Sequence, residues 1–232
     1  MNIAIIIAGG IGQRFGSNIP KQFIQVNNQP IILYTLRIFQ NASSIDKIVI
    51  VCVDGWQEFV YKLTSDYKLR KVVAVIKGGK SRFDSVYEGI KFCKKNYNDN
   101  DILIIHDSVR PCITEALISD SIKKAQEYGA ALATDICYDT MFVSEDGKQV
   151  DFVYPRNKLF KGQTPESVRL ELASKYYEKA ISGNLKIDSP TELFMWAGHK
   201  VGFSLGNKLN IKITTKEDIC IFKSIVGNYI KE

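Results

Sequence analysis

An apolar, β-branched run that leads directly into glycines constrains this chain more than any other feature. The run covers Ile3 to Ile7, and Ala8, Gly9, Gly10 and Gly12 follow at once. Such a run indicates a strand that is buried on both faces, as in a parallel sheet covered by helices. Glycines after the strand let backbone amides turn and approach an anion without steric cost. The start of the chain therefore predicts a phosphate-binding loop in an α/β fold.

Two cations follow this loop. Arg14 lies just after the glycines, and Lys21 stands in the sequence Pro20-Lys21-Gln22. A plain strand–loop turn would explain the glycines alone, but it gives no reason for the two cations beside them. The combination favours a polyphosphate ligand, and nucleotide chemistry is the leading hypothesis.

Two other glycine motifs fit less well. A dinucleotide-binding fingerprint needs an early third glycine and an acidic residue about 20 positions on. Here the third glycine falls late, at Gly16, and the second expected strand ends at Asp54, which is too distant. A P-loop needs a glycine where Ala74 stands before Gly79-Lys80-Ser81. A nicotinamide-linked dehydrogenase is therefore a weaker alternative, as is a P-loop enzyme.

Segments typical of strands and helices alternate along the chain. We expect strands at Ile3–Ile7, Lys47–Val53, Val72–Ile76, Ile102–Ile105, Ala130–Ala133 and Val201–Ser204. We expect helices at Ile31–Phe39, Phe83–Asn96, Glu115–Tyr128, Ser167–Ala180 and Lys216–Tyr229. This order predicts a Rossmann-like, mostly parallel sheet covered on both faces. Ligands of such sheets lie at the carboxyl ends of the strands, where the first glycine loop, Gly78-Gly79 and Asp107 all fall.

One segment breaks the alternation. The sequence of residues 139–154 is typical of a strand, the turn Ser144-Glu145-Asp146-Gly147 and a second strand. This pattern predicts a protruding β-hairpin arm. Two strands alone are marginally stable in water, so the arm needs a surface that covers it. That surface belongs either to a second subunit or to the arm's own domain.

Composition limits the remaining classes. A chain of 232 residues suits one domain, 1–232. The net charge of +6 comes from scattered lysines without a basic block, so no nucleic-acid partner is expected. The 5 cysteines are irregularly spaced and lack a Cys-x-x-Cys pair, which argues against a disulfide framework or a zinc site. No apolar stretch has membrane-spanning length, and we expect a cytoplasmic protein without a membrane partner.

Six short motifs in order resemble the cytidylyltransferases that act on polyol phosphates. They are Ala8 to Arg14 with Pro20-Lys21-Gln22, Gly78 to Val86, His106 to Pro111, Asp139-Thr140 with Arg156, Gln163-Thr164-Pro165, and Asn210 to Thr214. One branch of this family makes CDP-methylerythritol for isoprenoids, and a sister branch makes CDP-ribitol for wall or capsule polymers. The resemblance spans nearly the whole chain. It implies a fold of the nucleotide-diphospho-sugar transferase type, CTP as substrate, and a homodimer in which the arm clasps a second subunit.

The implied reaction needs positioning and positive charge more than a nucleophilic side chain. The attacking group is a phosphate oxygen, so the protein must bring two anions together and stabilise the charge that develops. We expect Arg14 and Lys21 to perform this catalytic task. The resemblance implies that Lys212 also contacts the charge that develops during the transfer. Asp107 follows an apolar run, and we expect it to hold Mg²⁺ among phosphate oxygens. His106 is expected to be structural.

The remaining site residues contact the two substrates. The expected nucleotide contacts are Ala8, Gly9, Gly10, Gly12, Gly78, Gly79, Arg82, Ser85 and Ser108. The expected contacts to the polyol phosphate are Thr140, Arg156 and Thr164. An arginine can hold a phosphate with two parallel hydrogen bonds, and the resemblance implies that Arg156 reaches across from the neighbouring subunit.

Several positions depart from the methylerythritol branch. Ser108 replaces an alanine, Pro155 stands where an acid is common, Glu166 replaces a glutamine, and Ile187-Asp188-Ser189 replaces a Thr-Asp-acid sequence. Ser108 and the run Gly162 to Pro165 are closer to the ribitol branch. We therefore expect D-ribitol 5-phosphate as acceptor, with 2-C-methyl-D-erythritol 4-phosphate as the alternative. An inactive, dimeric nucleotide-binding scaffold is the alternative of another class. Such a protein is expected to lack at least one of the charged residues Arg14, Lys21, Asp107 and Lys212, but all four are present.

Overall fold

The computed structural model describes residues 1–10, 19–183, 185, 187 and 189–229. The predicted site residues Gly12 and Arg14 lie outside this part of the chain. A seven-stranded sheet in the order β11-β7-β10-β6-β1-β4-β5 forms the centre of the fold. Its strands are β1 (Asn2–Ala8), β4 (Lys47–Cys52), β5 (Val72–Lys77), β6 (Ile102–Asp107), β7 (Ala130–Ile136), β10 (Phe160–Arg169) and β11 (Gly202–Leu205).

All the strand pairs of this sheet are parallel except the two that β10 makes with β6 and β7. The prediction of a mostly parallel sheet is therefore confirmed. Strand β1 lies between β4 and β6, and its side chains Ile3 to Ile6 are fully buried. The β-branched run is apolar at every position because both faces of this strand are covered.

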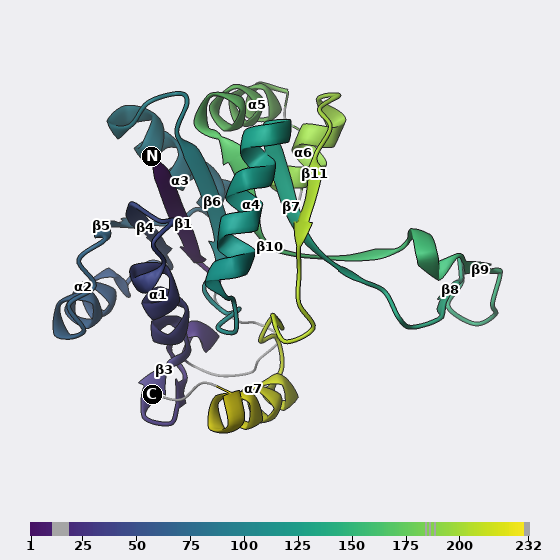
Figure 1. Ribbon diagram of the computed structural model, residues 1–232, viewed down its shortest axis with the longest axis horizontal. Coiled ribbons are helices and arrows are strands. Elements are labelled where there is room, and N and C mark those ends of the chain that lie inside the picture. The colour runs from purple at the N-terminus through teal and green to yellow at the C-terminus, as the bar shows by residue number, and fades with distance from the viewer. Residues whose placement is uncertain (11–18, 184, 186, 188, 230–232) are drawn as a thin grey trace.

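Helices cover both faces of the sheet (Figure 1). One face carries α1 (Ile31–Asn41), α2 (Gln57–Asp66) and α4 (Glu115–Tyr128), and the other carries α3 (Arg82–Asn96), α5 (Leu170–Ser182) and α6 (Pro190–Trp196). Alternate residues of β1 separate the two cores, since Ala4 and Ile6 pack into the first and Ile3 and Ile5 into the second. Among the described helices, none has the length and apolarity that crossing a bilayer requires.

A smaller core lies below the carboxyl ends of the strands. Helix α7 (Lys216–Tyr229) packs there against α1 and the short pair β2 (Gln25–Val26) and β3 (Gln29–Pro30). The Phe222 ring meets the Tyr34 ring edge-on, with 5.1 Å between centroids. This core fixes the loop that follows β6 and the segment that carries Lys212, because Val109 and Ile213 are both buried in it.

The sequence prediction was wrong at the start of α5. The expected helix at Ser167–Ala180 begins only at Leu170, and Ser167 to Arg169 form the end of β10. Strand β10 was not predicted because its central residues, Gln163 to Ser167, are mostly polar although they are buried. Their burial follows from the position of β10 between β6 and β7. Helices α2 and α6 were not predicted either.

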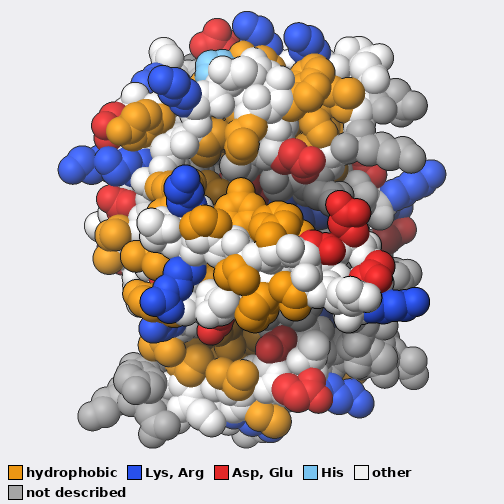
Figure 2. Space-filling view, turned by 90° about the vertical axis from the view of Figure 1, so that its right-hand side faces the viewer, with side chains coloured by type: hydrophobic (Ala, Val, Ile, Leu, Met, Phe, Trp, Pro, Cys, Tyr) orange, Lys and Arg blue, Asp and Glu red, His pale blue; other side chains and the backbone are white. Residues whose placement is uncertain are grey.

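The predicted hairpin arm is present. Strands β8 (Met141–Val143) and β9 (Phe152–Tyr154) pair antiparallel, and the short 3₁₀ helix η3 (Arg156–Lys158) follows them. The arm extends away from the sheet, as Figure 1 shows. Its large apolar side chains are exposed, among them Met141, Phe142, Val150, Phe152, Val153 and Tyr154. Figure 2 views this side of the molecule and shows hydrophobic side chains gathered across the middle of the face.

Candidate active site

A hollow of about 470 Å³ lies where β6 and β10 meet the segments around α6 and Lys212. Its lining includes Arg82, Asp107, Arg110, Gln163, Thr164, Glu166, Ser189, Thr191, Glu192, Met195 and Lys212. The six charged residues in this lining come from α3, β6, β10, α6 and two loops. Sequence-distant segments thus converge at one edge of the sheet, as α/β topology requires.

Asp107 is the centre of this charge cluster. Its Oδ1 lies 3.2 Å from Arg82 Nε, and its Oδ2 lies 2.8 Å from Lys212 Nζ and 3.7 Å from Arg110 Nε. Burial opposes the charge on Asp107, but the three cations outweigh it and hold the pKa of this carboxyl well below its usual range. The carboxylate therefore gathers three cations around a hollow that an anionic ligand can enter.

A second network fixes the position of Asp107 from behind. The Thr164 hydroxyl accepts a hydrogen bond from the Asp107 backbone N–H at 3.2 Å and pairs with His106 Nδ1 at 3.0 Å. Because the Arg110 carbonyl can only accept, His106 Nε2–H donates to it at 3.2 Å, and Nδ1 of the neutral ring then accepts from the Thr164 hydroxyl. Complete burial lowers the pKa of His106 to about 4. His106 is thus neutral and holds the loop, as expected of a structural residue.

The glycine loops meet at one hydroxyl group. A Cβ on Gly9 would lie 2.8 Å from Ser85 Oγ, and a Cβ on Gly78 would lie 2.9 Å from the same atom. The Ser85 hydroxyl accepts the Gly79 N–H at 3.2 Å and donates to the Ser81 carbonyl at 2.9 Å. Ser81 also caps α3 through a capping box with Asp84. The first turn of α3 therefore joins the two predicted nucleotide loops.

Gln22 connects the first loop to the segment of Lys21. Its Nε2 donates to the Ala8 carbonyl at 2.7 Å and to the Gly10 carbonyl at 3.0 Å, while Lys21 begins the short helix η2 (Lys21–Phe23). The described part of the first loop and the predicted cation Lys21 are therefore held together. Ser108 is buried directly after Asp107, and its backbone N–H donates to the Ile7 carbonyl at 3.0 Å.

The structure does not bring two predicted acceptor contacts to this hollow within one chain. Thr140 and Arg156 are exposed and lie on the arm, before β8 and after β9. Thr164 lines the hollow, but its hydroxyl is already bonded to His106 and Asp107. The roles of all three in substrate binding stay predictions.

Sequence analysis missed the role of Arg110. Its Nη1 donates to the Asn210 carbonyl at 2.8 Å, and the Asn210 amide nitrogen donates in turn to Gln163 Oε1 and to the Thr164 carbonyl. These bonds hold the Lys212 segment against β10. The sequence did carry one signal for Arg110, because it stands at the i+3 position from Asp107 within the motif His106 to Pro111.

The carboxylates of the hollow are already paired with other groups. Both oxygens of Asp107 are in contact with cations, and those of Glu166 are bonded to Arg82 and Thr191. Within the described ranges, no group of three or more His, Cys, Asp or Glu residues could hold a metal ion. This arrangement does not present Asp107 as a metal ligand. Its predicted magnesium role stays a prediction.

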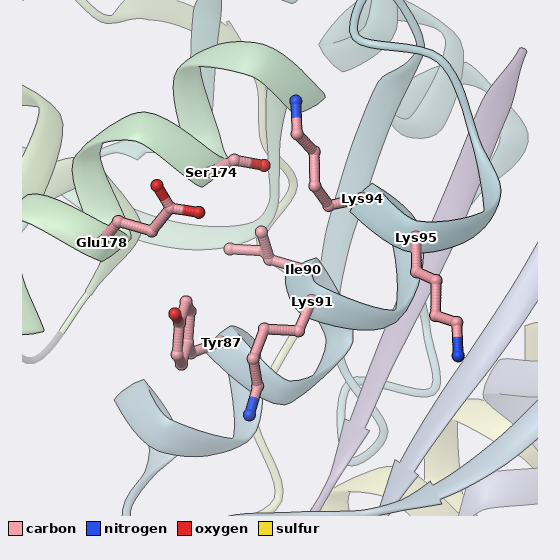
Figure 3. Close-up of a pocket in the computed structure, with 7 residues that line it drawn as sticks. All are labelled: Tyr87, Ile90, Lys91, Lys94, Lys95, Ser174 and Glu178. Atoms are coloured by element: carbon pink, nitrogen blue, oxygen red, sulfur yellow. The ribbon is translucent and has the colours of Figure 1, made fainter.

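A second hollow, of about 220 Å³, lies between α3 and α5 (Figure 3). Its lysines are dispersed over α3, where Lys91 pairs with Glu88 at 2.8 Å and Lys94 pairs with Asp99. It contains none of the predicted site residues. We therefore assign the active site to the larger hollow.

Comparisons with known proteins identify the family of this chain. The family described as IspD, 2-C-methyl-D-erythritol 4-phosphate cytidylyltransferase, matches residues 2–228. A ribitol-5-phosphate cytidylyltransferase of Lacticaseibacillus paracasei is 36% identical, covering 100% of this chain and 99% of its own. A 2-C-methyl-D-erythritol 4-phosphate cytidylyltransferase of Clostridium novyi is 38% identical over 98% of this chain and 97% of its own.

The solved structures agree with the fold. The 4-diphosphocytidyl-2C-methyl-D-erythritol synthase of Anaerococcus prevotii superposes with a TM-score of 0.83 at 26% identity, covering 98% of each chain. A 2-C-methyl-D-erythritol 4-phosphate cytidylyltransferase of Francisella tularensis superposes with a TM-score of 0.78 at 29% identity, covering 96% of this chain and 98% of its own. The predicted fold type is thereby confirmed.

Proposed function

Because the chain belongs to the 2-C-methyl-D-erythritol 4-phosphate cytidylyltransferase family, it is a CTP-dependent cytidylyltransferase, and we propose that it transfers CMP to D-ribitol 5-phosphate. The ion pair between Lys212 and Asp107, at the edge of a hollow large enough for a small phosphate, is the observation that carries the transfer chemistry. Ser108, which follows Asp107, and the run Gly162 to Pro165, of which Gly162, Gln163 and Thr164 line the hollow, support ribitol phosphate as acceptor. So does the full-length similarity to the Lacticaseibacillus enzyme.

In the proposed reaction, an oxygen of the acceptor phosphate attacks the α-phosphorus of CTP. The new P–O bond forms as the bond between the α-phosphorus and its bridging oxygen breaks, and pyrophosphate leaves with that electron pair. The nucleophile is already an anion, so no side chain has to remove a proton. Arg14, Lys21 and Lys212 stabilise the charge that develops on the α-phosphate and the leaving pyrophosphate, and Arg110 adds positive charge beside Asp107.

We retain Mg²⁺ as the proposed cofactor, carried by the phosphate oxygens of CTP and by water rather than by a protein cage. When bound there, it would neutralise charge on the triphosphate. The roles given above to Lys212 and Arg110 do not depend on it.

We also propose a homodimer in which the arm lies on a second copy of the chain. Supporting this, the apolar side chains of β8 and β9 are exposed, and a two-stranded hairpin needs a covering surface. In such a dimer, Thr140 and Arg156 of one subunit would complete the hollow of the other. This accounts for their distance from Asp107 in the single chain.

Pyrophosphate release tests the proposal directly. The enzyme is assayed with CTP, Mg²⁺ and either D-ribitol 5-phosphate or 2-C-methyl-D-erythritol 4-phosphate, in parallel. We expect a higher kcat/KM with ribitol phosphate. The similarity to the Clostridium enzyme favours methylerythritol phosphate as the second candidate, and a higher kcat/KM with that acceptor would replace ribitol phosphate. Release with neither acceptor would refute both.

A further inference from the structure

Glu166 joins two walls of the hollow that the chain sequence keeps far apart. This residue lies on β10 and is 5% exposed. Its Oε1 accepts a hydrogen bond from Arg82 Nη2 at 2.9 Å. Its Oε2 accepts two more, from the Thr191 N–H at 3.0 Å and from the Thr191 hydroxyl at 2.6 Å. One buried carboxylate thus fastens the start of α3 to the start of α6.

Only a carboxylate makes this set of bonds. All three groups that point at Glu166 are donors, two on Thr191 and one on Arg82. A glutamine offers one acceptor oxygen, and its amide nitrogen is itself a donor. With glutamine at this position, either Arg82 or Thr191 would face an N–H group without an acceptor. The acid at position 166 is therefore matched to the threonine at position 191.

The contact also determines which carboxylates pair with the Arg82 guanidinium. Arg82 lies between Glu166 and Asp107, whose carboxylates outweigh the effect of burial and raise its pKa. Removing one partner of a buried ion pair leaves a poorly compensated charge. Without Glu166, Asp107 is the one carboxylate among the described residues that pairs with Arg82, and Arg82 competes there with Lys212. Glu166 thereby leaves Lys212 available to a ligand.

The other end of the contact fixes the wall that faces the acceptor. Thr191 is the second residue of α6, and Ser189, Glu192 and Met195 of the same segment line the hollow. Of the described residues predicted to contact the nucleotide, Arg82 alone lines the hollow, and it keeps Asp107 as a partner when Glu166 is changed. The glycine loops, Ser85 and Ser108 are outside this lining. A change at Glu166 should therefore alter the acceptor half of the site much more than the CTP half.

We propose that Glu166 is a positioning residue that sets acceptor affinity by holding α6 and Arg82 in register. This inference rests on the proposed function, since it assumes that the hollow receives the polyol phosphate. Glu166 acts through Thr191 and Arg82 and takes no part in bond making. The pair Glu166–Thr191 is thus a determinant of acceptor binding in this chain.

Steady-state kinetics of three variants test the proposal. For Glu166→Gln, we expect the KM for the polyol phosphate to rise at least 10-fold while the KM for CTP changes less than 2-fold. Thr191→Val, which loses the hydroxyl donor, should raise the acceptor KM in the same way, and Thr191→Ser should recover most of that loss. Glu171→Gln is the matched control, because Glu171 is exposed at the start of α5. Equal rises in both KM values, or no rise in acceptor KM, would overturn the proposal.

Amide hydrogen exchange tests the same contact without any substrate. Peptides that cover α6 should exchange faster in Glu166→Gln than in the parent protein, and Glu171→Gln should leave them unchanged. Unchanged exchange over α6 in Glu166→Gln would refute the positioning role whatever the acceptor is. Failure of the parent enzyme to use either polyol phosphate, with faster exchange in the variant, would instead refute the proposed function and its acceptor assignment.

Discussion

Lys212 and Asp107 form an ion pair of unequal partners: the ammonium is 38% exposed, the carboxylate is 6% exposed, and 2.8 Å separates Nζ from Oδ2. The buried partner is shared with Arg82 and Arg110, so the cations outnumber it. The exposed partner faces the hollow. An anionic substrate can therefore meet the ammonium while the carboxylate still holds it in place.

Lys212→Ala tests this relationship. We expect kcat to fall on the order of 100-fold, because one preorganised charge that stabilises a transition state is typically worth this much. The measurement is pyrophosphate release at saturating CTP and acceptor. Lys123→Ala, an equal change at an exposed position of α4, is the control. A near-normal kcat for Lys212→Ala would contradict the catalytic role.

Asp107→Asn separates two roles for this carboxylate. If Asp107 orders the cations, its loss leaves Arg82, Arg110 and Lys212 repelling one another, and turnover falls at every magnesium concentration. We expect the concentration of Mg²⁺ that gives half-maximal activity to stay within about twofold of the parent value. A magnesium titration of initial rates measures it. A large rise in the requirement for Mg²⁺, with turnover restored at saturation, would show that Asp107 is a metal ligand.

The sequence predicted the parallel part of the fold well and the antiparallel part poorly. β1 and its neighbours have uniform apolar runs because helices cover both faces, and their boundaries were placed within a few residues. Strand β10 is buried from Gln163 to Val168, yet Gln163, Thr164 and Glu166 break the apolar pattern. Those residues are polar because they hold the site together. Prediction of this strand from the sequence therefore failed because polar residues of the site stand where a buried strand usually has apolar ones.

From the sequence, only those site residues that lie in recognisable short motifs could be predicted. Asp107 and Lys212 were recognised separately, and only the tertiary structure brings them together. Arg110 had only its spacing from Asp107 as a signal and Thr191 had none, because their roles depend on partners distant in sequence, Asn210 and Glu166.

Gly79→Ala should destabilise the nucleotide loop. A Cβ on Gly79 would lie 2.2 Å from Asp84 Cβ and 2.9 Å from the Asp84 carbonyl carbon, so the start of α3 must shift. We expect the free energy of unfolding to fall by about 1–3 kcal/mol, the usual cost of forced overpacking. Urea denaturation measures this change. Gly10→Ala is the matched variant, since a Cβ there meets no atom of the described residues within 4 Å, and it should keep the parent's stability. Equal stabilities for the two variants would contradict the steric argument.

His106 predicts how stability depends on pH. Its folded pKa of about 4 lies below the unfolded value near 6.5, so between these values only the unfolded state takes up a proton. Stability should therefore be lost as pH falls from about 6.5 to 4, by roughly 3 kcal/mol from this group alone.

Denaturant unfolding across this range tests the prediction. His106→Gln should flatten the slope, because an amide can accept from Thr164 and donate to the Arg110 carbonyl without titrating. His199→Gln leaves this network intact and should keep the parent slope. A parent protein with equal stability at pH 6.5 and pH 4 would contradict the assignment of a neutral, buried His106.

Mixed dimers test whether Arg156 serves the partner's site. Arg156→Ala and Lys212→Ala are each expected to be nearly inactive, and the two variants are co-expressed with different tags so that mixed dimers can be isolated. If Arg156 completes the other subunit's hollow, one site of each mixed dimer carries both substitutions and the other carries neither. Activity should then return to roughly half of the parent dimer's value. If Arg156 acts within its own subunit, each site keeps one defect and the mixed dimer stays inactive. Because the arm places Arg156 far from Asp107 in the single chain, we expect activity to return.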